Sequence, residues 1–161
     1  MIVGKSPFLD TPVWKLGHQD IAVVDQLEIL GTIFTSSLSC HAHVEKRCQA
    51  SKRTMHSLTS IGCCYPGLST DVRSHLWKTI GLPSMLYSMQ TINIQPKNMI
   101  LLEKLQSGTV KKILGFPVRC HHSHLLNSIN VHKPDFYINK KKLGLLASNV
   151  SACKLHALFS F

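Results

Sequence analysis

A chain of 161 residues is long enough for one folded domain with a buried core and too short for a polymerase with several subdomains. Its hydrophobic content of 44% and charged content of 16% exclude a disordered chain, in which low apolarity is combined with dense charge. No apolar run approaches the roughly 18 residues that span a bilayer, and no long apolar stretch follows Met1. We therefore expect an intracellular protein without a membrane partner, in the nucleus or elsewhere in the cell.

The charge is divided unevenly along the chain, and the division falls near residue 40. Residues 1–39 hold two cations against four acidic residues, whereas residues 40–161 hold sixteen Lys and Arg against four acidic residues. Such an excess of cations favours a polyanion as partner, because each neutralised phosphate releases condensed counterions. The alternative is that Lys-rich helices are simply well solvated. We expect a β-rich unit over 1–39 and a basic helical unit over 40–161.

The first unit contains short apolar and β-branched runs separated by turn residues. Met1–Gly4, Gln19–Asp25 and Leu27–Phe34 are the runs predicted to form strands. Gly31 interrupts the last run, and a glycine inside a strand indicates a bulge or a close approach by another backbone. The sequence therefore predicts a small antiparallel hairpin or sheet.

A helix is predicted from Cys40 to about Gly62. Val44, Cys48 and Met55 fall on one side of it at the helical period. Its cations lie opposite or beside this apolar face: Lys46, Arg47, Lys52 and Arg53. One side of the helix is thus suited to a core and the other to solvent or a polyanion.

Ser69 or Thr70 can cap a second helix. Gly81 and Pro83 are expected to interrupt this helix. Its expected apolar stripe is Val72, Leu76 and Ile80.

Pro96 can open a third helix, which Gly115 stops. Lys104 and Lys111 project together from the face opposite its apolar residues. A last helical region is predicted over Asp135–Leu158. The fold class is therefore α+β, with a small N-terminal antiparallel β hairpin or sheet followed by a mostly helical bundle.

Short motifs follow one another in order from the predicted hairpin to the third helix. They are Leu27–Gly31 (LEILG), His43–Arg47 (HVEKR), Gly67–Ser69 (GLS), Leu76–Tyr87 (LWKTIGLPSMLY) and Leu102–Gly115 with its LEKLQ and ILG elements. Their order and spacing resemble the region after the catalytic centre in non-LTR (LINE-type) retrotransposon reverse transcriptases. The chain departs from that pattern at Ile29, where the family has an aromatic residue, and at Ile92, near the family's usual tryptophan.

The resemblance implies a palm-end segment with a primer grip over 1–39 and a thumb-like helical segment over 40–161. It implies that the partner is the backbone of an RNA·DNA or DNA duplex, with an upstream polymerase palm or another protein chain as a further partner. The expected nucleic-acid-binding residues are Leu30, Gly31, Lys46, Arg47, Lys52, Arg53, Lys104 and Lys111. No aromatic residue is interleaved with these cations, so stacking on unpaired bases is not expected. From the residue pattern alone, an ordinary core strand and solvated helix faces remain the alternatives.

Catalysis by this chain alone is not expected. Two-metal nucleotidyl transfer needs clustered carboxylates, and no two acidic residues are adjacent in the sequence. The family's aspartate pair would lie upstream of Met1. We therefore expect no cofactor in this chain, with a divalent metal only in the full-length family enzyme.

Two groups of residues contain zinc-binding side chains, but neither has the spacing of paired half-sites for a structural ion. The groups are Cys40, His41, His43 and Cys48, and Cys120, His121, His122 and His124. We expect no metal site and free thiols. Two other interpretations stay open, namely a helical protein-interaction module and a non-functional remnant of a retroelement.

Overall fold

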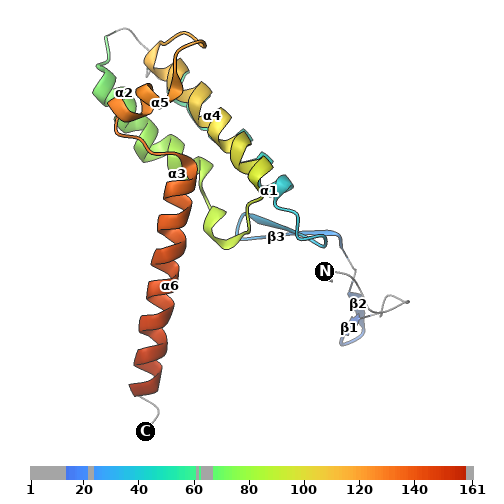
Figure 1. The fold of residues 1–161 in the computed structure, drawn as a ribbon. Helices are drawn as coiled ribbons and strands as arrows, with labels where there is room; N and C mark the ends of the chain where they lie inside the picture. The colour runs from blue at the N-terminus through green and yellow to red at the C-terminus, as the bar shows by residue number, and fades with distance from the viewer. Residues whose placement is uncertain (1–13, 22–23, 61, 63–66, 159–161) are drawn as a thin grey trace.

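The computed structural model describes residues 14–21, 24–60, 62 and 67–158. Two antiparallel hairpins come first, and helices make up most of the remainder of the described chain (Figure 1). The α+β class expected from the sequence is confirmed. The predicted strand Met1–Gly4 lies outside the described residues.

The described strands form two separate two-stranded sheets. In the first, β1 (Trp14–Leu16) pairs with β2 (Gln19–Ile21). In the second, β3 (Gln26–Ile29) pairs with β4 (Thr32–Thr35) so that Ile29 faces Thr32. The run Leu27–Phe34, predicted as a strand that Gly31 interrupts, is thus two strands joined by a two-residue turn.

Leu30 and Gly31 form that turn, and both have positive φ angles, 49° and 76°. A two-residue hairpin whose central residues both lie in the left-handed region has the type I′ geometry that matches strand twist. Gly31 is therefore required by a turn and not by a bulge.

The helical part begins at His41 with α1. Its elements are α1 (His41–Ser60), α2 (Thr70–Leu76), the π-helical η1 (Trp77–Gly81), α3 (Leu82–Met85), the 3-10 turn η2 (Met89–Thr91), α4 (Pro96–Leu114), α5 (His122–Ser128) and α6 (Pro134–Leu158). The predicted starts and stops of α1 and α4 are confirmed to within a few residues, and Ser69 Oγ caps α2 by accepting from the Val72 N–H. The helix α5 was not predicted.

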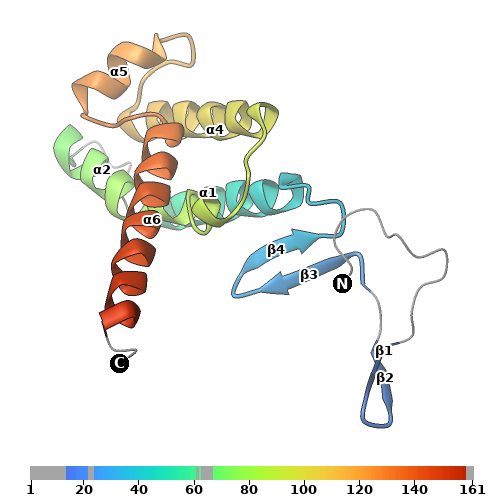
Figure 2. The same cartoon turned by 60° about the horizontal axis from the view of Figure 1, so that its bottom comes forward.

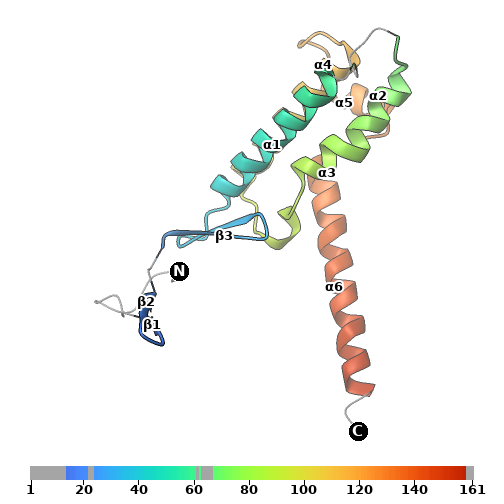
Figure 3. The same ribbon diagram turned by 180° about the vertical axis from the view of Figure 1, so that it is seen from behind.

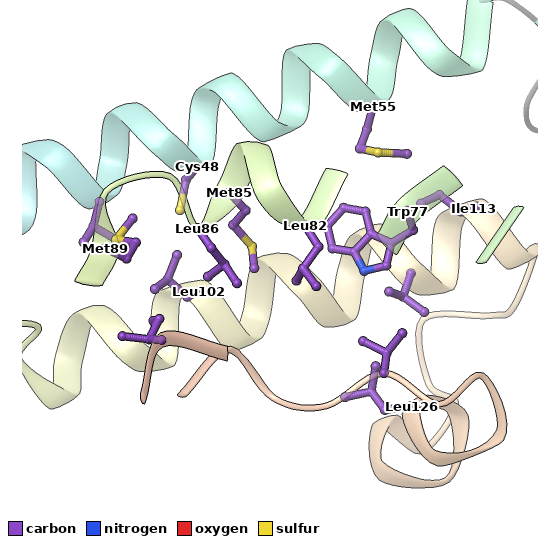
Figure 4. Packing of buried hydrophobic residues seen from close by; sticks show 14 of the residues in the cluster. Cys48, Met55, Trp77, Leu82, Met85, Leu86, Met89, Leu102, Ile113 and Leu126 are labelled. Carbon is purple, nitrogen blue, oxygen red and sulfur yellow. The ribbon is translucent and has the colours of Figure 1, made fainter. Parts of the chain in front are cut away.

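The helices α1 and α4 lie side by side and run in the same direction (Figure 2). Near their starts, Asn98 of α4 donates to Cys40 Sγ at 2.9 Å and accepts from His41 Nδ1 at 2.9 Å. The helices α2 and α3 pack against this pair. Figure 4 shows the buried side chains between them, which include Cys48, Met55, Trp77, Leu82, Met85, Leu86, Met89, Leu102, Ile113 and Leu126.

The second helical region departs from the prediction in two ways. It does not stop at Gly81 and Pro83, because Pro83 occupies the first turn of α3, where a missing N–H is tolerated. The turn before it widens, and the Leu82 N–H donates to Trp77 O, five residues back. Its buried face is also different: Ser74, Trp77 and Gly81 point to the core, whereas Val72 and Ile80 are exposed.

His43 fastens the β3–β4 hairpin to the helices. Its ring is fully buried, its Nδ1 accepts from the Ile33 N–H at 3.2 Å, and its Nε2–H donates to Tyr87 O at 3.2 Å. Burial lowers the pKa of His43, partly opposed by the hydrogen bond to Tyr87. This neutral imidazole therefore joins β4, α1 and the segment after α3.

Over residues 134–148, the part of α6 whose burial the structure describes, the start of the helix packs on the other elements. Pro134 and Ile138 are buried, whereas residues 139–148 are mostly exposed. Figures 1 and 3 show the helix extending away from the bundle. Among the described helices, none combines the length and apolarity needed to cross a membrane.

Candidate nucleic-acid interface

A groove of about 550 Å³ runs between α1 and α4. We call it the α1–α4 groove. Its floor is largely apolar, with Cys48, Met55, Leu101, Leu105 and Ile113 among the lining residues. Its cationic and ionisable side chains come from both helices: Lys52, His56, Lys104 and Lys112. Within the part of the chain that the structure describes, no Asp or Glu lines it.

The three lysines of this groove are exposed and free of acidic partners. The ion pairs found among the described residues are Lys15 with Asp20, Lys46 with Glu28, and Lys133 with Glu103, and none involves Lys52, Lys104 or Lys112. Cations gathered over a low-dielectric wall raise the local positive potential. The groove is therefore electrostatically suited to a polyanion.

A second groove, of about 740 Å³, lies beside the first one along α4. We call it the α4–loop groove, because residues 116–122 form its far wall. Its lining residues are Ile100, Glu103, Lys104, Ser107, Gly108, Lys111, Lys112, Phe116, Val118 and His122. Lys111 Nζ donates to Val118 O at 2.8 Å, which holds the loop against the helix. Burial lowers the pKa of His122, assisted by the charge of Lys111.

The structure brings some of the sequence-predicted cations together and separates others. Lys52 and Lys104 meet across the α1–α4 groove, and Lys104 and Lys111 share the α4–loop groove. Arg53 is exposed on α1 and lines neither groove. Lys46 pairs with Glu28 of β3, and this hydrogen bond and charge lower the pKa of the Glu28 carboxyl.

Leu30, Gly31 and Arg47 meet at Tyr87, away from both grooves. The Tyr87 hydroxyl donates to Leu30 O at 3.0 Å, and the Arg47 guanidinium lies 5.2 Å from the centre of the Tyr87 ring. A Cβ placed on Gly31 would lie 3.4 Å from Tyr87 Cε1. The hairpin turn is thus anchored by one aromatic residue, and its tip is open, since Leu30 is 87% exposed.

Sequence reasoning missed Lys112, His56 and Gly108. A signal was present for all three. Lys104, Gly108 and Lys112 recur at four-residue spacing and so share one face of a helix. His56 stands in the same relation to Lys52 on α1. A periodic search that included glycine and histidine as well as Lys and Arg would have found the rims of both grooves.

Three members of the first cysteine and histidine group have hydrogen-bond partners within the protein. Cys40 and His41 are hydrogen-bonded to Asn98, and His43 is held by backbone groups. Burial raises the pKa of the Cys48 thiol, which makes it a poor thiolate. Within the described ranges, no group of three or more His, Cys, Asp or Glu side chains is placed to hold a metal ion.

Comparison of the chain with protein-family models, with curated proteins and with solved structures gave no match in any of the three. The function proposed below depends on the chain's own residues.

Proposed function

We propose that this chain binds the sugar-phosphate backbone of a nucleic-acid duplex, RNA·DNA or DNA, through the α1–α4 groove. In this proposal it is a thumb-like fragment of a retrotransposon reverse transcriptase without the catalytic carboxylates. The observation that carries the binding proposal is the set of three lysines around this groove. Among the described residues, no acidic side chain lines the groove and none of the three lysines forms an ion pair.

The positions of these lysines suit a backbone better than a base edge. Lys52 approaches from α1, and Lys104 and Lys112 approach from α4 two turns apart. Flexible ammonium groups spread along a groove neutralise successive phosphates, but they present no fixed fork for reading bases. We therefore expect binding that depends on salt and little on sequence.

The test is a titration of labelled RNA·DNA and DNA duplexes at several salt concentrations, followed by fluorescence anisotropy. For three to five neutralised phosphates on B-DNA, the logarithm of the binding constant should fall with the logarithm of salt at a slope of about −3 to −5. The triple variant Lys52→Gln, Lys104→Gln, Lys112→Gln should bind more weakly, and the magnitude of its slope should fall by nearly one unit for each lysine.

A matched control removes the same charge elsewhere. The triple variant Lys140→Gln, Lys141→Gln, Lys142→Gln changes three lysines on α6, outside both grooves. It should keep most of the affinity and the slope of the unmodified chain. Equal losses in the two triple variants would reject the groove as the site and leave only a general charge effect.

The family assignment is supported by the order of the motifs and by the cluster at Tyr87. That cluster joins the turn of the LEILG motif to the HVEKR helix and to the tyrosine that ends the fourth motif, LWKTIGLPSMLY. Its test is the gene sequence upstream of Met1. An in-frame Tyr-x-Asp-Asp turn within a few dozen codons would support a polymerase, and stop codons alone would indicate a remnant.

A second candidate function, docking on another protein chain, is favoured by the apolar surface of α6. Leu143, Leu145 and Leu146 are all exposed on the part of the helix that leaves the bundle. Exposed apolar surface of this kind is typical of an interaction site. A monodisperse monomer that binds no apolar dye would contradict this second function.

A further inference from the structure

Gly108 lies in the middle of α4 without a structural reason. A glycine weakens a helix interior relative to alanine. A Cβ at Gly108 would meet nothing within 4 Å, and its φ is not in the left-handed region. Neither packing nor backbone conformation therefore requires glycine here.

The position of Gly108 connects the two grooves. Lys104 and Lys112 lie one turn before it and one turn after it on the same face of α4. All three residues line both the α1–α4 groove and the α4–loop groove. Gly108 thus lies between two lysines on the strip of α4 that both grooves share, and we call this position the saddle.

The α4–loop groove also contains an aromatic ring beside the lysines. Gly115, with a φ of 75°, ends α4 and lets the chain reverse, and the Phe116 N–H donates to Lys111 O at 2.9 Å. Phe116 is 45% exposed and lines the groove with Ile100 and Val118, which are exposed as well. The sequence analysis expected no aromatic residue among the cations, whereas this reversal places Phe116 next to residues that precede it in the helix.

We propose that a single-stranded extension of the nucleic acid crosses α4 at Gly108, with its backbone between Lys104 and Lys112 and a base stacked on Phe116. This inference rests on the proposed function and extends it from duplex to unpaired strand. A position without a side chain lets a sugar-phosphate backbone approach the helix closely. An exposed ring beside cations is the usual platform for an unpaired base.

A paired base suits this groove poorly, because its faces are already stacked within the duplex. Glu103 also lines the wall, and it is 3.6 Å from Lys133, whose charge offsets its own. The combination of a saddle, two lysines and an exposed ring therefore favours a single strand.

The test compares a blunt DNA duplex with the same duplex carrying an eight-nucleotide thymidine overhang. The unmodified chain should bind the overhang probe about fivefold or more tightly. Gly108→Leu fills the saddle and leaves every lysine in place, and this variant should bind the overhang probe no more tightly than it binds the blunt duplex. The readout is the ratio of the two affinities within one variant, because Gly108 also lines the α1–α4 groove. Its melting temperature should stay equal or rise, because leucine is the better helix former and meets open space.

Gly144→Leu is the matched control. Gly144 is a glycine within α6 at which a Cβ also meets nothing within 4 Å. The same substitution there should leave the binding of both probes unchanged. Phe116→Leu should lose the overhang preference, whereas Phe116→Tyr should keep it, because only the second variant retains an aromatic face.

Two results separate this inference from the proposed function. If the unmodified chain binds neither probe, the proposed function fails and this inference fails with it. If it binds both probes equally, or if Gly108→Leu keeps the overhang preference, duplex binding stands and the crossing point is rejected. An acidic amphipathic peptide that binds at the saddle in place of the overhang would also reject it.

Discussion

At the scale of single residues, the contact between Trp77 and Gly81 shows how closely the core is packed. Trp77 is 1% exposed, and a Cβ on Gly81 would lie 2.2 Å from its Cε3 atom and 2.9 Å from Met55 Sδ. The indole ring is a rigid neighbour that cannot move aside. The packing of Trp77 in this position therefore depends on a glycine at position 81.

Gly81→Ala should destabilise the chain by about 1 to 3 kcal/mol, because the added methyl group overpacks the core against Trp77. Urea unfolding followed by circular dichroism measures the change. Gly108→Ala is the control, since the same substitution in open space should stabilise the helix by up to about 1 kcal/mol. Equal effects at the two glycines would show that the contact with Trp77 does not decide the result.

Leu30 is a second residue of interest, because its backbone conformation is unfavourable. It has a φ of 49°, a left-handed conformation that disfavours a branched aliphatic side chain, and its side chain packs against little. Leu30→Asn should stabilise the hairpin by roughly 0.5 to 1 kcal/mol, because Asn-Gly is the preferred pair in a type I′ turn. The free energy of unfolding tests this, and a loss of stability would mean that Leu30 makes contacts that outweigh its backbone strain.

At the scale of elements, His43 holds the β3–β4 hairpin only in its neutral form. Its Nδ1 must accept from the Ile33 N–H, and a protonated ring has no free lone pair for this. Burial lowers the pKa of His43 in the folded chain, and the unfolded chain binds the proton more readily. The contribution of His43 to stability is therefore complete above the unfolded pKa of about 6.5 and is lost as pH falls below it.

The measurement is the midpoint of urea unfolding between pH 7.5 and pH 5. We expect stability to fall across this range in the unmodified chain, with His122 adding to the fall because burial also lowers its pKa. His43→Gln should be less stable at pH 7.5, and its stability should depend less steeply on pH. An unchanged pH dependence in this variant would exclude His43 as the group responsible.

The elements themselves were largely predictable, since the apolar positions of α1 and α4 follow the helical period closely. The buried face of α2 and η1 was not, because it is formed by Ser74, Trp77 and Gly81, of which only the tryptophan is apolar, while the apolar Val72 and Ile80 face solvent. Hydrophobic periodicity predicts the buried face of a helix only where that face consists of apolar residues. Local patterns also carried no sign of the wide turn before Pro83.

At the scale of the whole molecule, the first part of α6 packs on the bundle and the part that follows projects from it. Ile138 is buried, whereas Leu143 is 66% exposed and Leu146 is 61% exposed. The double variant Leu143→Glu, Leu146→Glu should change stability by less than about 0.5 kcal/mol, because it alters only exposed positions. Ile138→Ala should cost about 2 to 4 kcal/mol. Thermal and urea unfolding measure both variants, and a large loss in the double variant would mean that the projecting leucines are covered by another chain.

The candidate site was predictable in part. Charge and helical spacing found Lys52 and Lys104, because both stand on helices whose apolar faces fix their orientation. The same reasoning placed Lys46 among free cations, although Glu28, eighteen residues earlier, pairs with it. The four-residue spacing of Lys104, Gly108 and Lys112 is visible in the sequence, but the two grooves that they line are not, since these depend on which elements come to lie beside α4. The same is true of the place of Phe116 in the second groove.

The fastening of the hairpin by His43 has a consequence for the order of folding. Its two hydrogen bonds reach residues ten and forty-four positions away along the chain. The longer of these contacts forms only after the chain through η1 and α3 has packed on α1, and long loops close slowly. We expect the hairpin to dock late, so that substitutions in its turn change the rate of unfolding and leave the rate of folding almost untouched.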